Sequence, residues 1–437
     1  MTRLVRMAAR LSLLFLIFGA PVACADTNGR LDSAVSPAFE AVSLDIDATS
    51  KDYRGSVRID VRVAKPTREL EFHAEEMTIE SARLTGGDGD AIPLECELRD
   101  GGFVTARASV DLAPGDYALE IAFAKDYNTK AVGLYRITEG GIGYLFTQFE
   151  AVDARKAFPC WDEPGYKIEW QMTIRIPEDQ EIVTNTPVAT ETRADGHKTV
   201  VFERTPPMPS YLLAIAAGPL ESVEITGMSV PGRVYCTQGQ KHLTGLAVQV
   251  APKALGALEK WFGRAYPYKK LDLIAVPEYW PGAMENPGAV TYKDGLLLLD
   301  SETASVSQRR TLARVTTHEF AHMWFGDLVT MSWWDDLWLN ESFADWLGDK
   351  ICNGLFPEYN IEVSEVQGSQ NIMVGDARPS SSAIRKTVDS PDDIEEDLML
   401  AYEKGKTILH MVEMWVGEDA FHRGVLDYIN RHAWGNT

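Results

Sequence analysis

Apolar and polar residues alternate with a period of two through much of the first half of the chain. The alternating segments are residues 56–63, 103–112, 117–124 and 168–176. This pattern predicts strands with one buried face, because successive side chains of a strand point to opposite sides of a sheet. Clusters of glycine, proline and aspartate separate the segments and predict turns. We therefore expect an N-terminal domain built as a saddle or sandwich of antiparallel β-sheet.

The pattern changes to helical spacing after Pro231. Apolar residues recur every three to four positions in 243–262, 307–325, 337–351, 402–416 and 418–432. A short apolar strand at 271–276 lies between the first two of these segments. The chain is therefore expected to be an α+β multidomain protein, in which a mainly helical domain follows the β domain.

The first 25 residues have the composition of a secretory signal peptide. Three arginines precede an apolar run at 11–20, and Ala23-Cys24-Ala25 offers a cleavage site between small residues. The sequence predicts that residues 1–25 are removed on export to the periplasm or the medium. Acylation of Cys24, as in a lipoprotein, is the alternative. No other stretch reaches the 18 apolar residues of a membrane span, so no stable membrane span is expected.

Length, charge and cysteine spacing limit the possible domain organisation, partners and disulfide bridges. A chain of 437 residues is expected to form two domains, here 26–222 and 223–437. The formal net charge of −22 argues against nucleic acid as a partner. Four cysteines remain after the signal peptide, at 96, 160, 236 and 352. Their wide spacing predicts neither a disulfide framework nor a zinc-thiolate site, and leaves open small buried side chains or one disulfide bridge.

Candidate chemistry is concentrated in the segment at 307–325. His318 and His322 are four residues apart in a predicted helix, so both imidazoles project from one face and can share a metal ion. Glu319 lies beside them and can reach a water on that ion. Glu341 follows His322 by 19 residues, which allows the chain to turn and return as a second helix. Asp345, one turn further, is placed to hydrogen-bond a ligand histidine.

Two histidines and one glutamate predict one catalytic Zn²⁺ per chain, because three protein ligands leave the fourth position open. With the segment Gly282-Ala283-Met284-Glu285-Asn286, these residues resemble the aminopeptidase N family of gluzincins. Residues 147–164 and 324–341 are also similar to that family. The resemblance covers essentially the whole mature chain and implies a thermolysin-like zinc-peptidase domain.

The resemblance also implies roles that the residues alone do not show. It places Glu150 and Glu285 on the free α-amine of a peptide, and Gln148 beside the first side chain. Residues Gly282, Ala283, Met284 and Asn286 would bind the substrate backbone as an extended strand. Tyr402 would donate a hydrogen bond to the developing oxyanion. Pro287 stands where many members have tryptophan, so the rim of the pocket is expected to differ.

The expected function is a zinc aminopeptidase that releases the N-terminal residue of peptides, with Glu319 as general base. The alternatives are an endopeptidase with the same metal site, an enzyme that hydrolyses a lipid epoxide, and a non-catalytic peptide-binding protein or inactive fragment of the same fold. Family members usually continue beyond the length of this chain, so it resembles a truncated form whose catalytic domain lacks its C-terminal part. Exposed apolar surface on the last helices is then expected.

Overall fold

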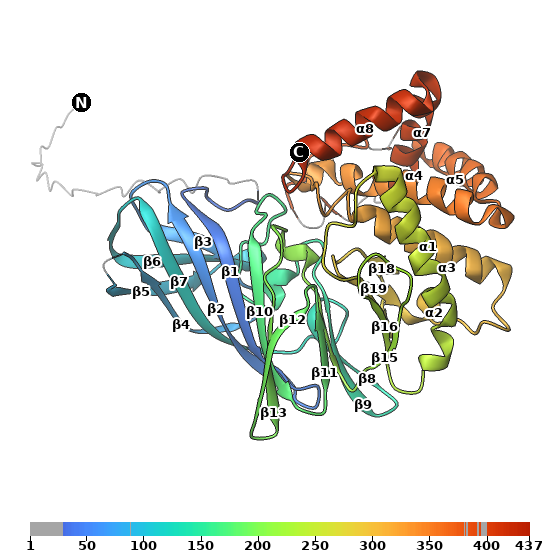
Figure 1. The fold of residues 1–437 in the computed structure, drawn as a ribbon. Helices are drawn as coiled ribbons and strands as arrows, with labels where there is room; N and C mark the ends of the chain where they lie inside the picture. The colour runs from blue at the N-terminus through green and yellow to red at the C-terminus, as the bar shows by residue number, and fades with distance from the viewer. Residues whose placement is uncertain (1–28, 88, 380, 382, 391–392, 395–399) are drawn as a thin grey trace, which may run out of the picture.

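The computed structural model describes residues 29–437 apart from 88, 380, 382, 391–392 and 395–399. The predicted signal peptide and Cys24 lie outside the described residues. A β-rich half in blue and green stands beside a helical half in orange and red (Figure 1). The predicted fold class, α+β with an N-terminal β domain before a mainly helical one, is confirmed.

The N-terminal half is dominated by a ten-stranded sheet. Its strand order is β12 (Val188–Ala194), β13 (His197–Phe202), β10 (Glu169–Pro177), β1 (Val35–Asp45), β2 (Asp52–Val63), β7 (Gly115–Asp126), β4 (Thr78–Thr85), β5 (Ala91–Leu98), β6 (Phe103–Leu112) and β3 (Thr67–His73). The alternation predicted β2, β6, β7 and β10 of these strands, because one face of each is packed; in β2, Val57, Ile59 and Val61 are all buried. One feature differs from the prediction of antiparallel sheet, since β1 and β10 pair in parallel.

Two smaller sheets lie between this sheet and the helices (Figure 1). One has four strands in the order β11 (Glu181–Thr184), β14 (Ile215–Gly218), β9 (Ile142–Gln148) and β8 (Gly133–Glu139). The other has five, in the order β15 (Glu221–Glu224), β16 (Arg233–Cys236), β17 (Asp272–Val276), β19 (Ala289–Lys293) and β18 (Ala283–Met284). In this second sheet the apolar pattern predicted β17, and the family resemblance implied the extended segment 282–286, which contains β18. Strands β15, β16 and β19 have four or five residues and were not predicted.

The helices follow the order α1 (Gly245–Phe262), α2 (Asp294–Leu297), α3 (Val306–His322), α4 (Trp338–Leu355), α5 (Ile361–Asp376), α7 (Gly405–Val416) and α8 (Glu418–His432). The bounds predicted for α8 are confirmed. The predicted helix 307–325 ends three residues early, and the one at 337–351 continues to Leu355. Leu400–Lys404 forms a π-helical turn before α7, in place of the first turn of the predicted helix 402–416. Helix α5 was not predicted.

Two hydrophobic cores hold the chain together. One fills the β half and extends to Val276, Met284 and Trp334 of the helical half, and the other lies among α1, α3, α4 and α8. Cys96, Cys160, Cys236 and Cys352 are free thiols, so the described residues contain no disulfide bridge. No helix among the described residues is long and apolar enough to cross a membrane.

Candidate metal and peptide site

Two antiparallel helices face each other with polar residues at every fourth position. Helix α3 is initiated by a capping box between Ser305 and Gln308, and α4 returns along it. Each helix presents three residues to the other, which we call the facing rows: Arg314, His318 and His322 on α3, and Glu341, Asp345 and Asp349 on α4. Spacing by four residues keeps each row on one helix face, so each residue of one row lies opposite a residue of the other.

The predicted metal ligands lie at one end of the facing rows. The Nε2 atoms of His318 and His322 are 3.0 Å apart. Glu341 Oε2 is 3.6 Å from the first and 3.4 Å from the second. Ligand atoms bound at about 2.0–2.1 Å on a tetrahedral zinc ion are separated by about 3.3 Å. The three atoms therefore fit a zinc ion without a change in backbone.

The other ring nitrogen of each imidazole, Nδ1, faces an oxygen atom of a neighbouring residue. His322 Nδ1 is 2.9 Å from the carbonyl oxygen of Phe325, and His318 Nδ1 is 3.3 Å from Asp345 Oδ1. Such partners leave Nε2 free to bind a metal. The turn after α3 supplies one of them: Gly326 has a φ of +117°, which a side chain would disfavour, and the backbone there passes close to His322.

Burial changes the properties of two carboxyl groups beside the histidines, Glu341 and Glu319. Glu341 Oε2 is buried without a hydrogen-bond partner among the described residues, as expected of an atom reserved for a ligand. Burial raises the pKa of Glu319 to about 8. A cation bound beside Glu319 would lower this pKa towards neutrality, where a carboxyl group can both take and return a proton.

A second group of carboxylates adjoins the metal ligands. Glu150, Glu285 and Glu341 have oxygens that lie within 4.8 Å of one another, so Glu341 belongs to both groups. Burial raises the pKa of Glu150, and the negative charge of Glu285 adds to the effect. Glu285 Oε1 is buried and has no hydrogen-bond partner among the described residues. Three carboxylates this close form a site for a positive charge.

Gln148 ends β9 at the wall of this site. Its amide accepts a hydrogen bond from the Tyr279 hydroxyl and donates to the Met284 sulfur at 3.7 Å. Met284 belongs to β18, so this contact joins the four-stranded sheet to the predicted backbone-binding segment. Residues from both halves of the chain therefore meet beside the carboxylates.

The segment 282–286 is held from both ends. Gly282 accepts a hydrogen bond from the Lys293 amide at 2.7 Å, and Asn286 Nδ2 donates to Thr291 Oγ1 at 3.3 Å. Between them, β18 pairs with β19 on one side and forms the edge of the five-stranded sheet. An edge strand presents main-chain donors and acceptors to an extended peptide.

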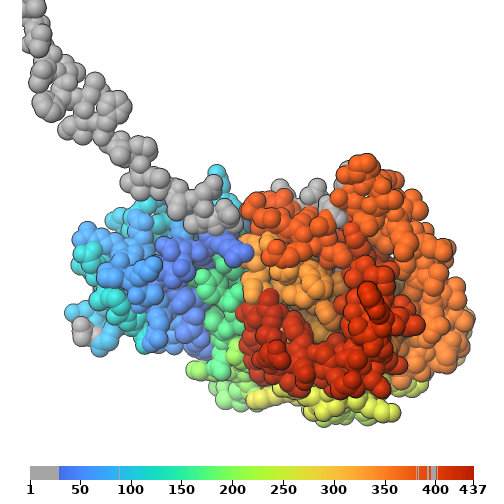
Figure 2. Space-filling view, turned by 90° about the horizontal axis from the view of Figure 1, so that it is seen from above, coloured from blue at the N-terminus to red at the C-terminus, as the bar shows by residue number. Residues whose placement is uncertain are grey.

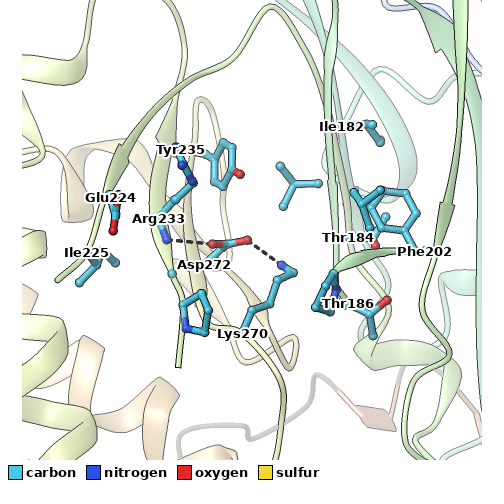
Figure 3. Close-up of a pocket in the computed structure, with 15 residues that line it drawn as sticks. Ile182, Thr184, Thr186, Phe202, Glu224, Ile225, Arg233, Tyr235, Lys270 and Asp272 are labelled. Carbon is cyan, nitrogen blue, oxygen red and sulfur yellow. Dashed lines mark hydrogen bonds and ion pairs between the residues drawn. The ribbon is translucent and has the colours of Figure 1, made fainter. Parts of the chain in front are cut away.

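Lys270 supports the loop that follows this segment. Its Nζ donates to Gly288 O at 2.7 Å and to Asp272 Oδ2 at 2.6 Å. Lys270 and Asp272 line a pocket of about 350 Å³ between β11, β13 and β16, in which they lie across from Thr184 (Figure 3). This pocket is separate from the metal ligands, which do not line it.

Tyr402 reaches the site from the π-helical turn Leu400–Lys404. Its ring stacks on that of His318, with the centroids 5.9 Å apart and the planes at 25°. Burial raises the pKa of Tyr402, and the carboxylate of Glu341 is the next cause. The phenol is therefore protonated at working pH and can donate a hydrogen bond beside the metal ligands.

The structure brings together every site residue predicted from the sequence: Gln148, Glu150, Gly282, Ala283, Met284, Glu285, Asn286, His318, Glu319, His322, Glu341 and Tyr402. Their individual roles remain predictions. Sequence reasoning missed Arg314, Asp349 and Lys406, whose side chains surround Asp345. The first two could have been found, since each lies one helical turn beyond a predicted site residue on the same face.

Comparison with known proteins agrees with this geometry. Residues 36–212 match the peptidase M1 N-terminal domain, and residues 246–437 match the peptidase family M1 domain. The chain is 37% identical to aminopeptidase 2 of Candida albicans over 395 residues, which are 88% of this chain and 42% of that protein. It is 34% identical to the alanine/arginine aminopeptidase of Saccharomyces cerevisiae over 416 residues, 93% of this chain and 49% of that protein.

A third relative, aminopeptidase M1 of Arabidopsis thaliana, is 32% identical over 419 residues, 93% of this chain and 48% of that protein. The chain thus spans about half the length of the curated relatives that it matches. The two domain matches cover both halves of the fold, and the His-His-Glu group lies within the second matched range. The chain belongs to peptidase family M1.

Proposed function

We propose that this protein is a zinc aminopeptidase that removes the first residue from peptides with a free α-amine. The observation that carries the proposal is the overlap of two groups of ligands at Glu341. His318 and His322 complete the metal group, and Glu150 and Glu285 complete the group for a positive charge. A peptide amine held by the second group has its first peptide bond beside the first group.

The carboxylates provide the recognition of the peptide end. An α-ammonium group donates charge-assisted hydrogen bonds to Glu150 and Glu285, which lowers the repulsion between them. An acetylated or internal residue offers no positive charge and leaves buried carboxylates unpaired. Such a substrate is therefore rejected by a cost in free energy as well as by a lost attraction.

The reaction uses two further groups of this chain. A bound zinc ion supplies the Lewis acid that polarises the scissile carbonyl and lowers the pKa of a water molecule. Glu319 takes the proton of the attacking water and passes it to the leaving amine. Tyr402 donates a hydrogen bond to the oxygen on which negative charge develops. The segment 282–286 holds the substrate backbone extended.

The test is hydrolysis of one peptide in two forms, with a free and with an acetylated amino terminus. We expect release of the first residue from the free form only, and loss of this activity when a chelator removes the metal.

Glu319→Ala should abolish turnover and still bind zinc. Tyr402→Phe should lower kcat by roughly a hundredfold or more with little change in KM, the scale of one lost oxyanion donor.

Two other outcomes would identify different functions. Equal cleavage of both peptide forms would identify an endopeptidase and remove Glu150 and Glu285 from the mechanism. Zinc binding without any cleavage would identify a non-catalytic peptide-binding protein. A Tyr402→Phe enzyme with unchanged kcat would show that the phenol does not contact the oxyanion.

A further inference from the structure

The middle of the facing rows contains a buried cation that the proposed reaction does not use. Lys406 is only 2% exposed, and its Nζ contacts three carboxylates. The distances are 2.9 Å to Asp345 Oδ2, 3.0 Å to Asp349 Oδ2 and 3.3 Å to Glu403 Oε2. A buried ammonium group is retained only where such partners offset its lost hydration.

The two oxygens of Asp345 have different partners. Oδ1 lies 3.3 Å from His318 Nδ1, and Oδ2 lies 2.9 Å from Lys406 Nζ. Lys406 therefore fixes the rotation of the carboxylate that orients a metal ligand. Because a carboxylate that is held in place keeps the imidazole in one tautomer, the contact with Lys406 acts on the metal site through Asp345.

Arg314 does not serve the same purpose. Its guanidinium forms a two-pronged contact with Asp349, in which Nη2 is 2.8 Å from Oδ2. The nearest Asp345 oxygen is 3.8 Å from Arg314, beyond hydrogen-bond distance. Among the described lysines and arginines, Lys406 is thus the one that contacts Asp345 at hydrogen-bond distance.

Lys406 also connects the metal ligands to Tyr402. It lies in the first turn of α7, four residues after Tyr402 and directly after the π-helical turn that carries the phenol. The same ammonium contacts Glu403 of that turn and two residues of α4. A displacement of α7 from α4 would therefore move the phenol relative to His318 and disturb Asp345 at once.

We propose that Lys406 is a positioning residue of the metal site, which holds Asp345 on His318 and sets the place of Tyr402 beside the metal ligands. The inference rests on the proposed zinc site. Because the proposed role depends only on contacts within this chain, a measurement of zinc affinity tests it as directly as a measurement of activity does.

The experiment compares Lys406→Met with a matched variant, Lys350→Met. Lys350 also connects α4 to the helices that follow, through Glu413 at 2.5 Å and Glu418 at 2.7 Å, but has no contact with the facing rows. Zinc affinity is measured by competition with a chromophoric chelator. Lys406→Met should weaken zinc binding roughly 10–100-fold, the usual effect of losing support behind a metal ligand. Lys350→Met should stay within about twofold of the parent protein, since it leaves that support intact.

Kinetics and conservative variants separate positioning from general stability. Lys406→Met should lower kcat more than it changes KM. Lys406→Arg should recover part of the lost zinc affinity and part of the lost kcat. Lys406→Gln keeps a hydrogen-bond donor without the charge, and it replaces Lys406→Met in the zinc measurement if the methionine variant does not fold. It too should bind zinc more weakly than the parent protein. An unchanged zinc affinity in a folded Lys406→Met or Lys406→Gln protein would overturn the proposal. If the parent protein itself takes up no zinc, the proposed function fails instead.

Discussion

Glu40 carries the most isolated carboxyl group of the N-terminal half. It lies on β1 between β2 and β10, is 0% exposed, and has no hydrogen-bond partner for either oxygen among the described residues. Burial raises the pKa of Glu40 well above its ordinary value, and the charge of Asp162 adds to the effect. The group is therefore protonated in the folded protein at pH values where it is ionised in the unfolded chain.

This difference makes stability depend on pH in a definite direction. Above the unfolded pKa of about 4.3, unfolding releases the proton of Glu40, so the free energy of unfolding falls as pH rises, until the folded pKa is passed. Each pH unit in that range costs about 1.4 kcal/mol from this one group. Replacement by glutamine removes the effect. Glu40→Gln should therefore gain stability relative to the parent as pH increases.

Urea unfolding of the parent and Glu40→Gln at pH 5, 6, 7 and 8 measures the effect. The matched control is Glu95→Gln on the exposed surface of β5, whose difference from the parent should not grow in the same way. If the difference between Glu40→Gln and the parent stays constant across these pH values, Glu40 does not hold a proton in the fold.

At the scale of elements, the metal site depends on how closely α3 and α4 approach. Gly348 marks the closest contact: a Cβ at this position would lie 2.9 Å from both the Cα and the backbone nitrogen of His318. Backbone atoms cannot move aside as a flexible side chain can. The absence of a side chain at Gly348 therefore sets the separation of the helices that carry the ligands.

Gly348→Ala should move α4 away from α3. We expect a loss of about 1–3 kcal/mol in the free energy of unfolding, as for other overpacked positions, together with weaker zinc binding. The control is Gly354→Ala near the end of the same helix, where a Cβ would meet nothing within 4 Å. That variant should gain about 0.5–1 kcal/mol from the higher helix propensity of alanine. Equal stability of Gly348→Ala and the parent would show that the helices adjust freely.

Sequence patterns predicted long, one-sided elements and failed for short or uniform ones. Strand β6 and helix α8 have the predicted bounds, because a single packed face repeats along each. Helix α5 was missed because its apolar residues do not form one buried face; Val363, Val366 and Val374 are all exposed. The strands around the segment 282–286 were missed because their length is set by pairing with β19 and β17 rather than by a period.

Some residues of the candidate site could likewise be predicted from sequence spacing, and others could not. His318, His322 and Glu341 follow from spacing, since ligand geometry fixes their separation on two helices. Glu150 and Glu285 could be chosen only through family resemblance, because a lone acid in a loop has no distinguishing pattern. Lys406 comes from a third helix, and its contact with Asp345 depends on tertiary packing that no local pattern encodes.

At the scale of the whole molecule, the helical half exposes an apolar face. The most exposed side chains of this face are Trp415, which is 86% exposed, and Met414, which is 71% exposed. Met411 and Val416 of α7 and Met373 of α5 are also exposed. The last two helices, in red, lie on the surface of this half (Figure 2). A groove of about 730 Å³ adjoins the face between α4, α5 and α7. The exposed apolar surface expected on the last helices is therefore present on α7.

Exposed apolar faces of this kind promote association. We expect residues 29–437 to self-associate as concentration rises, and the double variant Met414→Lys with Trp415→Glu to remain smaller. Sedimentation velocity over a range of concentrations measures both. Val306→Lys is the control, since Val306 is also exposed but stands at the start of α3 rather than on this face. Concentration-independent sedimentation of the parent protein would contradict the expectation.

The position of Glu150 has a consequence for how such enzymes can diverge. The metal ligands belong to α3 and α4, whereas Glu150 and Gln148 follow from β9 in the other half of the chain. In the proposed function, part of the recognition of the peptide end is thus encoded in the N-terminal half, apart from the metal ligands, whereas Glu285 belongs to the same half as those ligands. Changes confined to the N-terminal half can then alter which peptides are accepted while the hydrolytic apparatus stays as it is.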